Sequence, residues 1–309
     1  MLTRRSTLWM SAALMVAVSV PVAAQTAPTP QPLPVVASFS ILADFVTEVG
    51  GPRVAVTALV GPDGDGHVYQ PTPADARTVA AARLVIVNGL GFEGWMDRLV
   101  KASGSRATIV TATRSVKPLR DPEAGHGHGH AHGQHVDPHA WQDVGNARLY
   151  VTAIRDALIE ADPAGRSDYE ARATAYLGRL EALDGEIKAA IAKIPANRRR
   201  VITSHDAFGY FSKAYGLVFV APQGVSTESE ASAKDVARII RQIRAEKLPA
   251  VFLENVSDPR LMERIAKETG ARIGGKLYSD ALSRADGTAG TYIEMMRNNI
   301  RELSSALSS

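Results

Sequence analysis

The stretch Ala164–Ile194, AGRSDYEARATAYLGRLEALDGEIKAAIAKI, decides the fold of this chain. Its apolar residues recur at spacings of three and four, which is the period of one helix face. They are Tyr169, Ala173, Tyr176, Leu180, Leu183, Ile187 and Ile191. A helix of about 30 residues rises roughly 45 Å at 1.5 Å per residue, which is enough to run the height of two domains. We therefore expect one long helix that ends before Pro195 and acts as a rigid spine.

Strand-like and helix-like segments alternate on both sides of this helix. The expected strands lie at residues 34–40, 54–60, 84–87, 107–112, 200–203, 217–220, 250–253 and 272–277. The expected helices lie at residues 41–49, 71–82, 146–160, 207–215, 233–246, 259–269 and 292–307. Strands that alternate with helices predict parallel sheets with helices on both faces.

The predicted fold class is therefore α/β, with two domains that are each a mainly parallel sheet flanked by helices and are joined by the long rigid helix. The N-terminal domain should span 34–145 and the C-terminal domain 198–309. Residues 146–197 should form the helical connector. A chain of this length can bury a large core, and the length favours two domains.

The first 24 residues have the pattern of a secretory signal peptide. Arg4 and Arg5 precede a nearly continuous apolar run, and small residues at 22–24 offer a cleavage site. The alternative is a membrane anchor, but the apolar run is short for a span of about 20 residues. Export by the general or the twin-arginine route stays open. Residues 25–33 are Pro-rich and should form a flexible leader.

Charge and cysteine content exclude several functions. Removal of residues 1–24 takes away two arginines and lowers the formal net charge from +3 to about +1. A nearly neutral chain argues against nucleic acid as a partner. The chain has no cysteine, so disulfides and thiolate metal sites are excluded. Because no cysteine can carry a lipid, we expect a soluble periplasmic protein that is not a lipoprotein.

Three isolated histidines and one aspartate suggest a metal site. His67, His205 and Asp280 each follow an expected strand, and His139 leads into the helical connector. Three neutral imidazoles and one carboxylate make a closed tetrahedral set that suits zinc. Ligands of open parallel sheets lie beyond the carboxyl ends of the strands. Because each half of the chain supplies two of the four residues, we expect the site in the cleft between the domains.

The identity of the carboxylate ligand is open from chemistry alone. Acidic residues in comparable loops compete with Asp280. They are Asp63, Asp65, Asp137, Asp143, Asp206 and Glu254. Most aspartates in such loops are helix caps.

A second histidine cluster lies in a Gly-rich run at about residues 121–136. It holds His126, His128, His130, His132 and His135. Alternating glycine and histidine cannot pack a core, which predicts a mobile loop. We expect weak zinc capture, or handover of zinc to the tighter site. The alternative is a solvated spacer without function.

Six segments together resemble one protein family. They are Gly66–Pro73 (GHVYQPTP), Asn88–Trp95 (NGLGFEGW), Asp137–Asp143 (DPHAWQD), Thr203–Phe211 (TSHDAFGYF), Ser226–Asp235 (STESEASAKD) and Leu277–Leu282 (LYSDAL). In this order they resemble the periplasmic solute-binding proteins of zinc and manganese ABC importers, and within these the zinc-uptake proteins. One departure is Gln142-Asp143, which replaces the more usual continuation of the DPHAW segment.

The resemblance implies a function and a ligand set. It selects Asp280 as the carboxylate ligand beside His67, His139 and His205. Histidine at position 205 is typical of zinc binders, whereas manganese binders typically have glutamate there. The implied cargo is Zn²⁺, and the implied partner is an inner-membrane ABC permease. A zinc-donating periplasmic protein is a further candidate partner, and the protein is expected to be a monomer without catalytic activity.

Three alternatives remain at this point. A manganese or iron carrier of the same fold would prefer more oxygen ligands. A zinc hydrolase would keep one coordination position open for water, and the sequence has neither an HExxH nor a Gly-x-Ser-x-Gly motif. A periplasmic zinc buffer would work through the clustered histidines alone.

Overall fold

A computed structural model describes residues 31–120 and 136–308 of the chain. Residues 32–309 form one compact unit. The predicted signal peptide, most of the predicted leader and the five clustered histidines lie outside the described residues. In the part of the chain that is described, no helix is both long and apolar enough to span a membrane.

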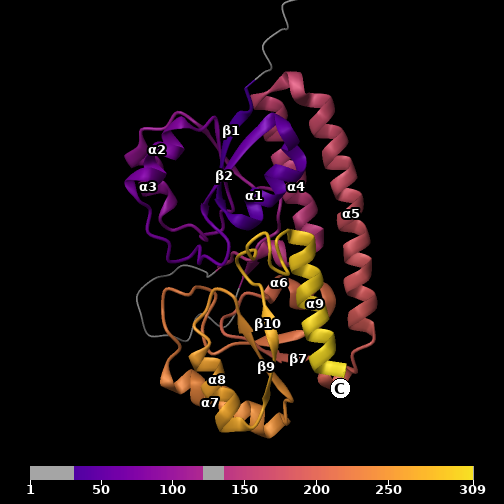
Figure 1. The fold of residues 1–309 in the computed structure, drawn as a ribbon. Helices are drawn as coiled ribbons and strands as arrows, with labels where there is room; N and C mark the ends of the chain where they lie inside the picture. Colours follow the sequence, from indigo (N-terminus) through magenta and orange to yellow (C-terminus); the bar gives the residue numbers. More distant parts are fainter. Residues whose placement is uncertain (1–30, 121–135, 309) are drawn as a thin grey trace, which may run out of the picture. The chain divides into compact units, whose positions relative to one another are not determined.

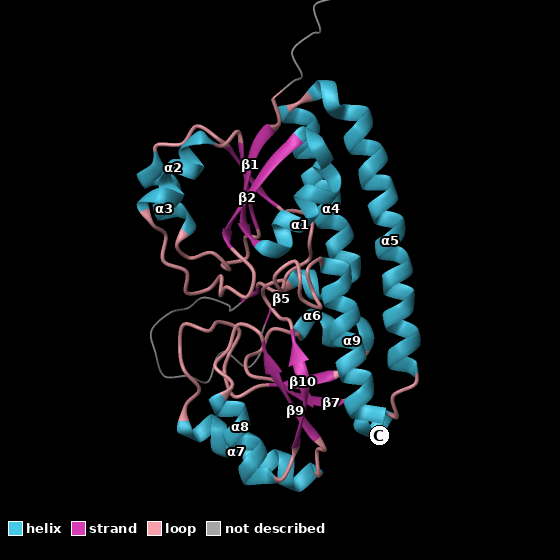
Figure 2. Ribbon diagram, in the orientation of Figure 1, coloured by secondary structure: helices cyan, strands magenta, loops and turns pink. Residues whose placement is uncertain are grey.

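The first sheet is parallel and has the strand order β2-β1-β3-β4 (Figure 1). Its strands are β1 (Leu33–Phe39), β2 (Val54–Val60), β3 (Leu84–Val87) and β4 (Thr108–Thr111). The central strand β1 pairs through Val35 with both Val56 and Leu84. Helices α2 (Pro73–Ala81) and α3 (Met96–Ser103) pack against each other on one side, and α1 (Ser40–Gly50) lies on the other (Figure 2).

The second sheet is also parallel, with the order β10-β9-β7-β8. Its strands are β7 (Arg200–Ile202), β8 (Val218–Val220), β9 (Ala250–Glu254) and β10 (Arg272–Leu277). The helices around it are α6 (Gly209–Tyr215), α7 (Ala233–Glu246), α8 (Arg260–Thr269) and α9 (Tyr292–Ser308). The register of β10 shifts between Ile273 and Lys276. Gly275 there has a φ of 137°, and a Cβ on Gly274 would meet Phe252 and Ala306, so α9 packs closely on this irregularity.

Two antiparallel helices join the halves. They are α4 (Val144–Ala161) and α5 (Arg166–Ala192), and the buried residues of α5 are the seven that its periodicity predicts. At 1.5 Å per residue the 27 residues of α5 span about 40 Å. This helix packs on α1 and α4 in the first half and on α9 in the second (Figure 1). The predicted fold class, two parallel sheets linked by a long helix, is therefore confirmed. The predicted domain boundaries stay predictions.

The structure adds elements that the sequence analysis did not predict. Helix α3 is one, and an antiparallel ribbon of β5 (Leu119–Arg120) and β6 (Val136–Asp137) is another. Short 3-10 turns lie at Gly51–Arg53 (η1), Ala140–Gln142 (η3), Pro163–Gly165 (η4) and Ala196–Arg198 (η5). The ribbon matters for the site because Asp137, two residues before His139, pairs with Leu119.

Candidate metal centre

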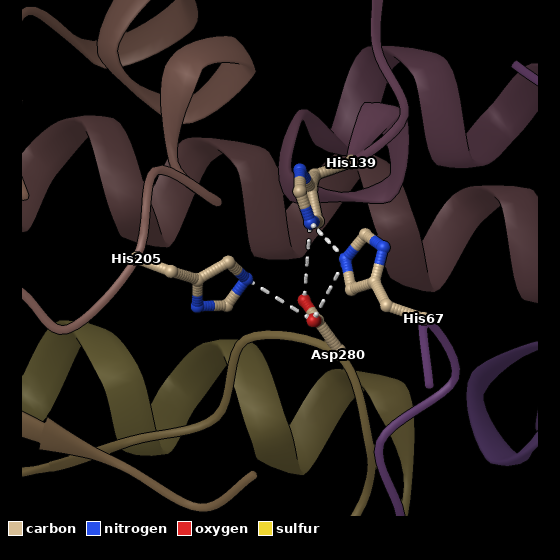
Figure 3. Close-up of side chains that lie close together, drawn as sticks. All are labelled: His67, His139, His205 and Asp280. Atoms are coloured by element: carbon tan, nitrogen blue, oxygen red, sulfur yellow. Dashed lines mark hydrogen bonds and ion pairs between the residues drawn. The ribbon is translucent and has the colours of Figure 1, made fainter. Parts of the chain in front are cut away.

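The structure brings all four predicted ligands together (Figure 3). One ligand atom from each of His67, His139, His205 and Asp280 can be chosen so that all lie within 4.8 Å of one another. His67 Nε2 lies 3.2 Å from His139 Nε2. The Asp280 carboxylate lies 3.2 Å from His205 Nε2, 3.4 Å from His67 Nε2 and 3.5 Å from His139 Nε2. Every imidazole thus presents Nε2 to the same point.

The fold explains this convergence. His67 follows β2, His205 follows β7 and Asp280 follows β10, so these three come from the carboxyl ends of parallel strands. His139 lies between β6 and η3 at the start of the helical connector. The four side chains lie together between loops of the two sheets. His67 is 6% exposed, and the other three side chains are fully buried.

Two of the histidines have a second carboxylate on the ring nitrogen that faces away from the centre. His139 Nδ1 lies 2.8 Å from Asp137 Oδ1, and His205 Nδ1 lies 2.5 Å from Glu254 Oε2. Glu254 Oε1 also accepts the backbone N–H groups of Ser204 and His205. A carboxylate on Nδ1 fixes the tautomer and ring orientation that leave Nε2 free to bind a metal.

The sequence analysis named Asp137 and Glu254 only as competitors for the carboxylate ligand. In the structure both serve as hydrogen-bond partners of ligand candidates. The Asp137-Pro138-His139 spacing was a usable signal, because an aspartate often accepts the backbone N–H two residues on. His139 N donates to Asp137 Oδ1 at 2.9 Å. No comparable local signal marks Glu254, which lies 49 residues from His205.

Three other competitors accept hydrogen bonds of their own. Asp143 caps α4 by accepting the N–H of Gly145. Asp63 accepts a hydrogen bond from Asn255, and Asp65 accepts the N–H of His67. Neither joins the cluster of ligand atoms.

Aromatic rings and amides enclose the centre. The ring centroids of Phe92 and His67 are 4.7 Å apart, and those of Trp141 and His139 are 5.3 Å apart. Trp141 Nε1 and Gln142 Nε2 both donate to the carbonyl of Ser279, at 2.8 and 2.7 Å. The unusual Gln142 therefore helps to hold the loop of Asp280. Apolar walls exclude water, and this strengthens attraction between a cation and its ligands.

The carboxylates and imidazoles of the centre shift one another's pKa values. Burial alone would lower the pKa of the His205 imidazole, but the carboxylates of Glu254 and Asp280 outweigh burial and raise this pKa well above its ordinary value. Burial alone would raise the pKa of the Asp280 carboxyl, but His205 and His139 lower it well below its ordinary value. Asp280 is therefore a carboxylate at any physiological pH. Among the described residues neither of its buried oxygens finds a well-aligned hydrogen-bond donor, which fits a role as a cation ligand.

Residues 35–306 match the model of a protein family described as zinc-uptake complex component A, periplasmic. This chain belongs to that family. Its members are metal-binding solute-binding proteins of ABC transporters, which bind metal ions and deliver them to a permease.

Three curated relatives differ in the metal that their names give. The manganese-binding lipoprotein MntA of Halalkalibacterium halodurans is 35% identical over 89% of both chains. The zinc-binding protein TroA of Treponema pallidum is 35% identical over 88% of both. The iron-binding protein YfeA of Yersinia pestis is 33% identical over 86% of this chain and 83% of its own. The family thus establishes a divalent metal as cargo, and the metal itself is a separate question.

The solved structures include a similar fold. The periplasmic zinc-binding protein TroA from Treponema pallidum superposes with a TM-score of 0.84 at 33% identity, covering 91% of this chain and all of that one.

These comparisons correct one prediction. We expected a soluble protein that is not a lipoprotein, because the 309 residues contain no cysteine thiol. The relative MntA and three streptococcal relatives at 30–31% identity are named lipoproteins. The expectation is therefore wrong, because these similar proteins are named lipoproteins and point to a lipoprotein.

Proposed function

We propose that this protein binds one Zn²⁺ through Nε2 of His67, His139 and His205 and a carboxylate oxygen of Asp280, and delivers it to an ABC permease. The separations among these atoms support zinc. With zinc–ligand distances of about 2.0–2.1 Å, the edge of a tetrahedron is roughly 3.3 Å. Three separations that share Asp280 Oδ2 or join His67 Nε2 to His139 Nε2 lie between 3.2 and 3.4 Å, and all four ligand atoms lie within 4.8 Å of one another.

The donor set supports zinc over manganese. Three of the four ligands are imidazole nitrogens, and hard cations such as Mn²⁺ prefer more oxygen ligands. Glu254 also occupies the Nδ1 side of His205, so Glu254 offers no oxygen to the centre and His205 offers only its Nε2 nitrogen. Manganese or iron remains the second candidate because relatives named for those metals are as similar to this chain as the zinc-binding relative.

Two further parts of the proposal concern segments outside the described residues. Residues 1–24 act as an export signal. The five histidines from His126 to His135 capture additional zinc weakly, because alternating glycine and histidine offers many imidazoles without a packed framework.

Competitive titration tests the choice of metal. Protein spanning residues 25–309 is stripped of metal and titrated with Zn²⁺ and Mn²⁺ against a fluorescent chelator. We expect one tight site with at least about 100-fold preference for zinc. Equal or reversed preference would contradict zinc as the cargo and leave metal transport intact. Loss of the tight site in His139→Ala, but not in the variant that lacks the clustered histidines, would support the ligand assignment.

A further inference from the structure

Two Asp-x-His turns carry ligand candidates, and they differ in one contact. In Asp65-Gly66-His67 and in Asp137-Pro138-His139, the aspartate Oδ1 accepts the histidine backbone N–H at 2.9 Å. Asp137 Oδ1 also contacts the ring of its own histidine. The free oxygen of Asp65, Oδ2, instead accepts the hydroxyl of Thr227 at 2.6 Å. Thr227 lies 162 residues away in the other half of the protein.

The Thr227 end of this contact is connected to a second ligand candidate. Gln223 Nε2 donates to the carbonyl oxygens of Thr227 and Ser229, at 3.2 and 2.7 Å. Gln223 also forms an isolated β-bridge with His205, and its N–H donates to Ser204. A chain of hydrogen bonds thus runs from His67 through Asp65, Thr227 and Gln223 to Ser204, the neighbour of His205, without passing through the metal position.

The loop that carries His67 has a second attachment to the other half. Asp63 N donates to the Leu282 carbonyl at 2.9 Å, and Asn255 Nδ2 donates to Asp63 Oδ1 at 3.1 Å. Leu282 is two residues beyond Asp280. The loop therefore contacts the segment that carries Asp280, in addition to the segment of Thr227.

His67 is the most accessible of the four candidates. It is the only one with measurable exposure, and the next residue, Val68, is 46% exposed. Asp65 and Thr227 are both partly exposed, so water can replace their hydrogen bond. His139 and His205, by contrast, are fully buried and held by carboxylates on their rings.

We propose that the Asp65–Thr227 hydrogen bond is a positioning contact that keeps His67 on the metal and sets the rate of metal release. The inference rests on the proposed function, in which His67 is a ligand. When the contact breaks, the loop loses the attachment to the second half that lies next to His67, and the contacts of Asp63 remain. His67 then departs first, and the remaining three ligands stay in place.

Stopped-flow kinetics with Zn²⁺ and an excess of chelator test this contact. Thr227→Val removes the hydroxyl at nearly constant volume, and we expect metal dissociation to accelerate about tenfold. Association should change by less than about threefold, because the other ligands are unaffected. Thr227→Ser keeps a hydroxyl group at this position and should release metal at the wild-type rate. The matched control is Thr152→Val on α4, where the hydroxyl bonds the carbonyl of Arg148.

A double-variant cycle links the effect to Asp65. In an Asp65→Ala background, Thr227→Val should have no further effect on dissociation. A wild-type rate of metal dissociation in Thr227→Val would overturn the proposal. An equal rise of the association and dissociation rates would also overturn it. So would an undiminished effect of Thr227→Val on dissociation in the Asp65→Ala background. Each of these outcomes leaves zinc binding by the wild-type protein, and hence the proposed function, intact. Absence of tight zinc binding by the wild type would instead refute the proposed function.

Discussion

His205 Nδ1 and Glu254 Oε2 lie 2.5 Å apart, and both side chains are fully buried. Glu254 is the last residue of β9. Its other oxygen, Oε1, accepts the backbone N–H groups of Ser204 and His205. This pair fixes which nitrogen of His205 faces the metal and raises the basicity of that nitrogen.

Glu254→Gln should weaken zinc binding by about 10- to 100-fold, because the amide keeps the backbone contacts but loses the negative charge on the Nδ1 side. Glu246→Gln is a matched control, since Glu246 is an exposed residue of α7 paired with Arg200. Isothermal titration against a competing chelator measures both. An affinity within threefold of wild type would show that Glu254 does not tune the site.

His205→Glu should shift preference from zinc toward manganese by at least about tenfold, because a soft imidazole nitrogen becomes a hard carboxylate oxygen. The structure adds a cost: the new carboxylate faces Glu254 and Asp280 in a buried site, so the metal-free variant should unfold at a lower temperature. The double variant His205→Glu with Glu254→Gln should recover part of that loss. An unchanged zinc-to-manganese ratio would count against His205 as a ligand.

Zinc affinity should rise with pH through the neutral range. Binding requires His205 to lose its proton, and the raised pKa of this imidazole keeps the proton bound to higher pH than usual. Asp280, whose pKa is lowered, stays ionised and contributes no change. Between pH 7.5 and pH 5, proton competition at His205 should weaken binding by at least about tenfold, as zinc titrations at the two pH values would measure. A loss below tenfold would contradict His205 as a ligand.

Trp141 and Gln142 both donate to the Ser279 carbonyl, and we expect either donor alone to satisfy this acceptor. Trp141→Phe or Gln142→Leu removes one donor and should cost about 0.5–1.5 kcal/mol beyond any packing change. The double variant leaves a buried carbonyl without a donor, so its loss should exceed the sum by about 1 kcal/mol. Urea unfolding of the metal-free protein measures all three, and strictly additive losses would contradict the shared role.

Replacement of residues 121–135 by Asn-Gly should remove the weak zinc sites and keep the tight one. The flanking residues Arg120 and Val136 are paired in an antiparallel ribbon, and Asn-Gly is a preferred two-residue hairpin turn. Equilibrium dialysis should give one zinc per chain, with affinity within about threefold of wild type. Loss of the tight site would contradict the separate roles of the two histidine sets.

The candidate site was predictable where it depends on topology. His67, His205 and Asp280 follow parallel strands, and the carboxyl ends of such strands meet at one edge. The roles of Asp137 and Glu254 were not predictable in the same way. A carboxylate becomes a metal ligand or a partner of Nδ1 according to which imidazole nitrogen it faces, and that depends on how the rings are oriented once the two sheets have packed.

The elements of the fold also divide into those that the sequence predicts and those that depend on tertiary packing. Helix α5 was predictable because seven apolar residues keep one period over its whole length. Helix α3 has only Met96 and Leu99 buried, which is too few residues to define a period. The ribbon of β5 and β6 has two residues in each strand, and its pairing depends on the position of Tyr210, whose hydroxyl accepts the N–H of Leu119.

Helix α5 has a consequence for how a loaded carrier is recognised. One continuous element packs on α1 and α4 at one end and on α9 at the other, so the two halves cannot swing far apart without breaking a buried apolar seam. We therefore expect gain or loss of the ion to alter the outer dimensions of the molecule very little. An importer that distinguishes loaded from empty carriers would then have to recognise local changes in exposed residues beside the site, such as Val68 next to His67.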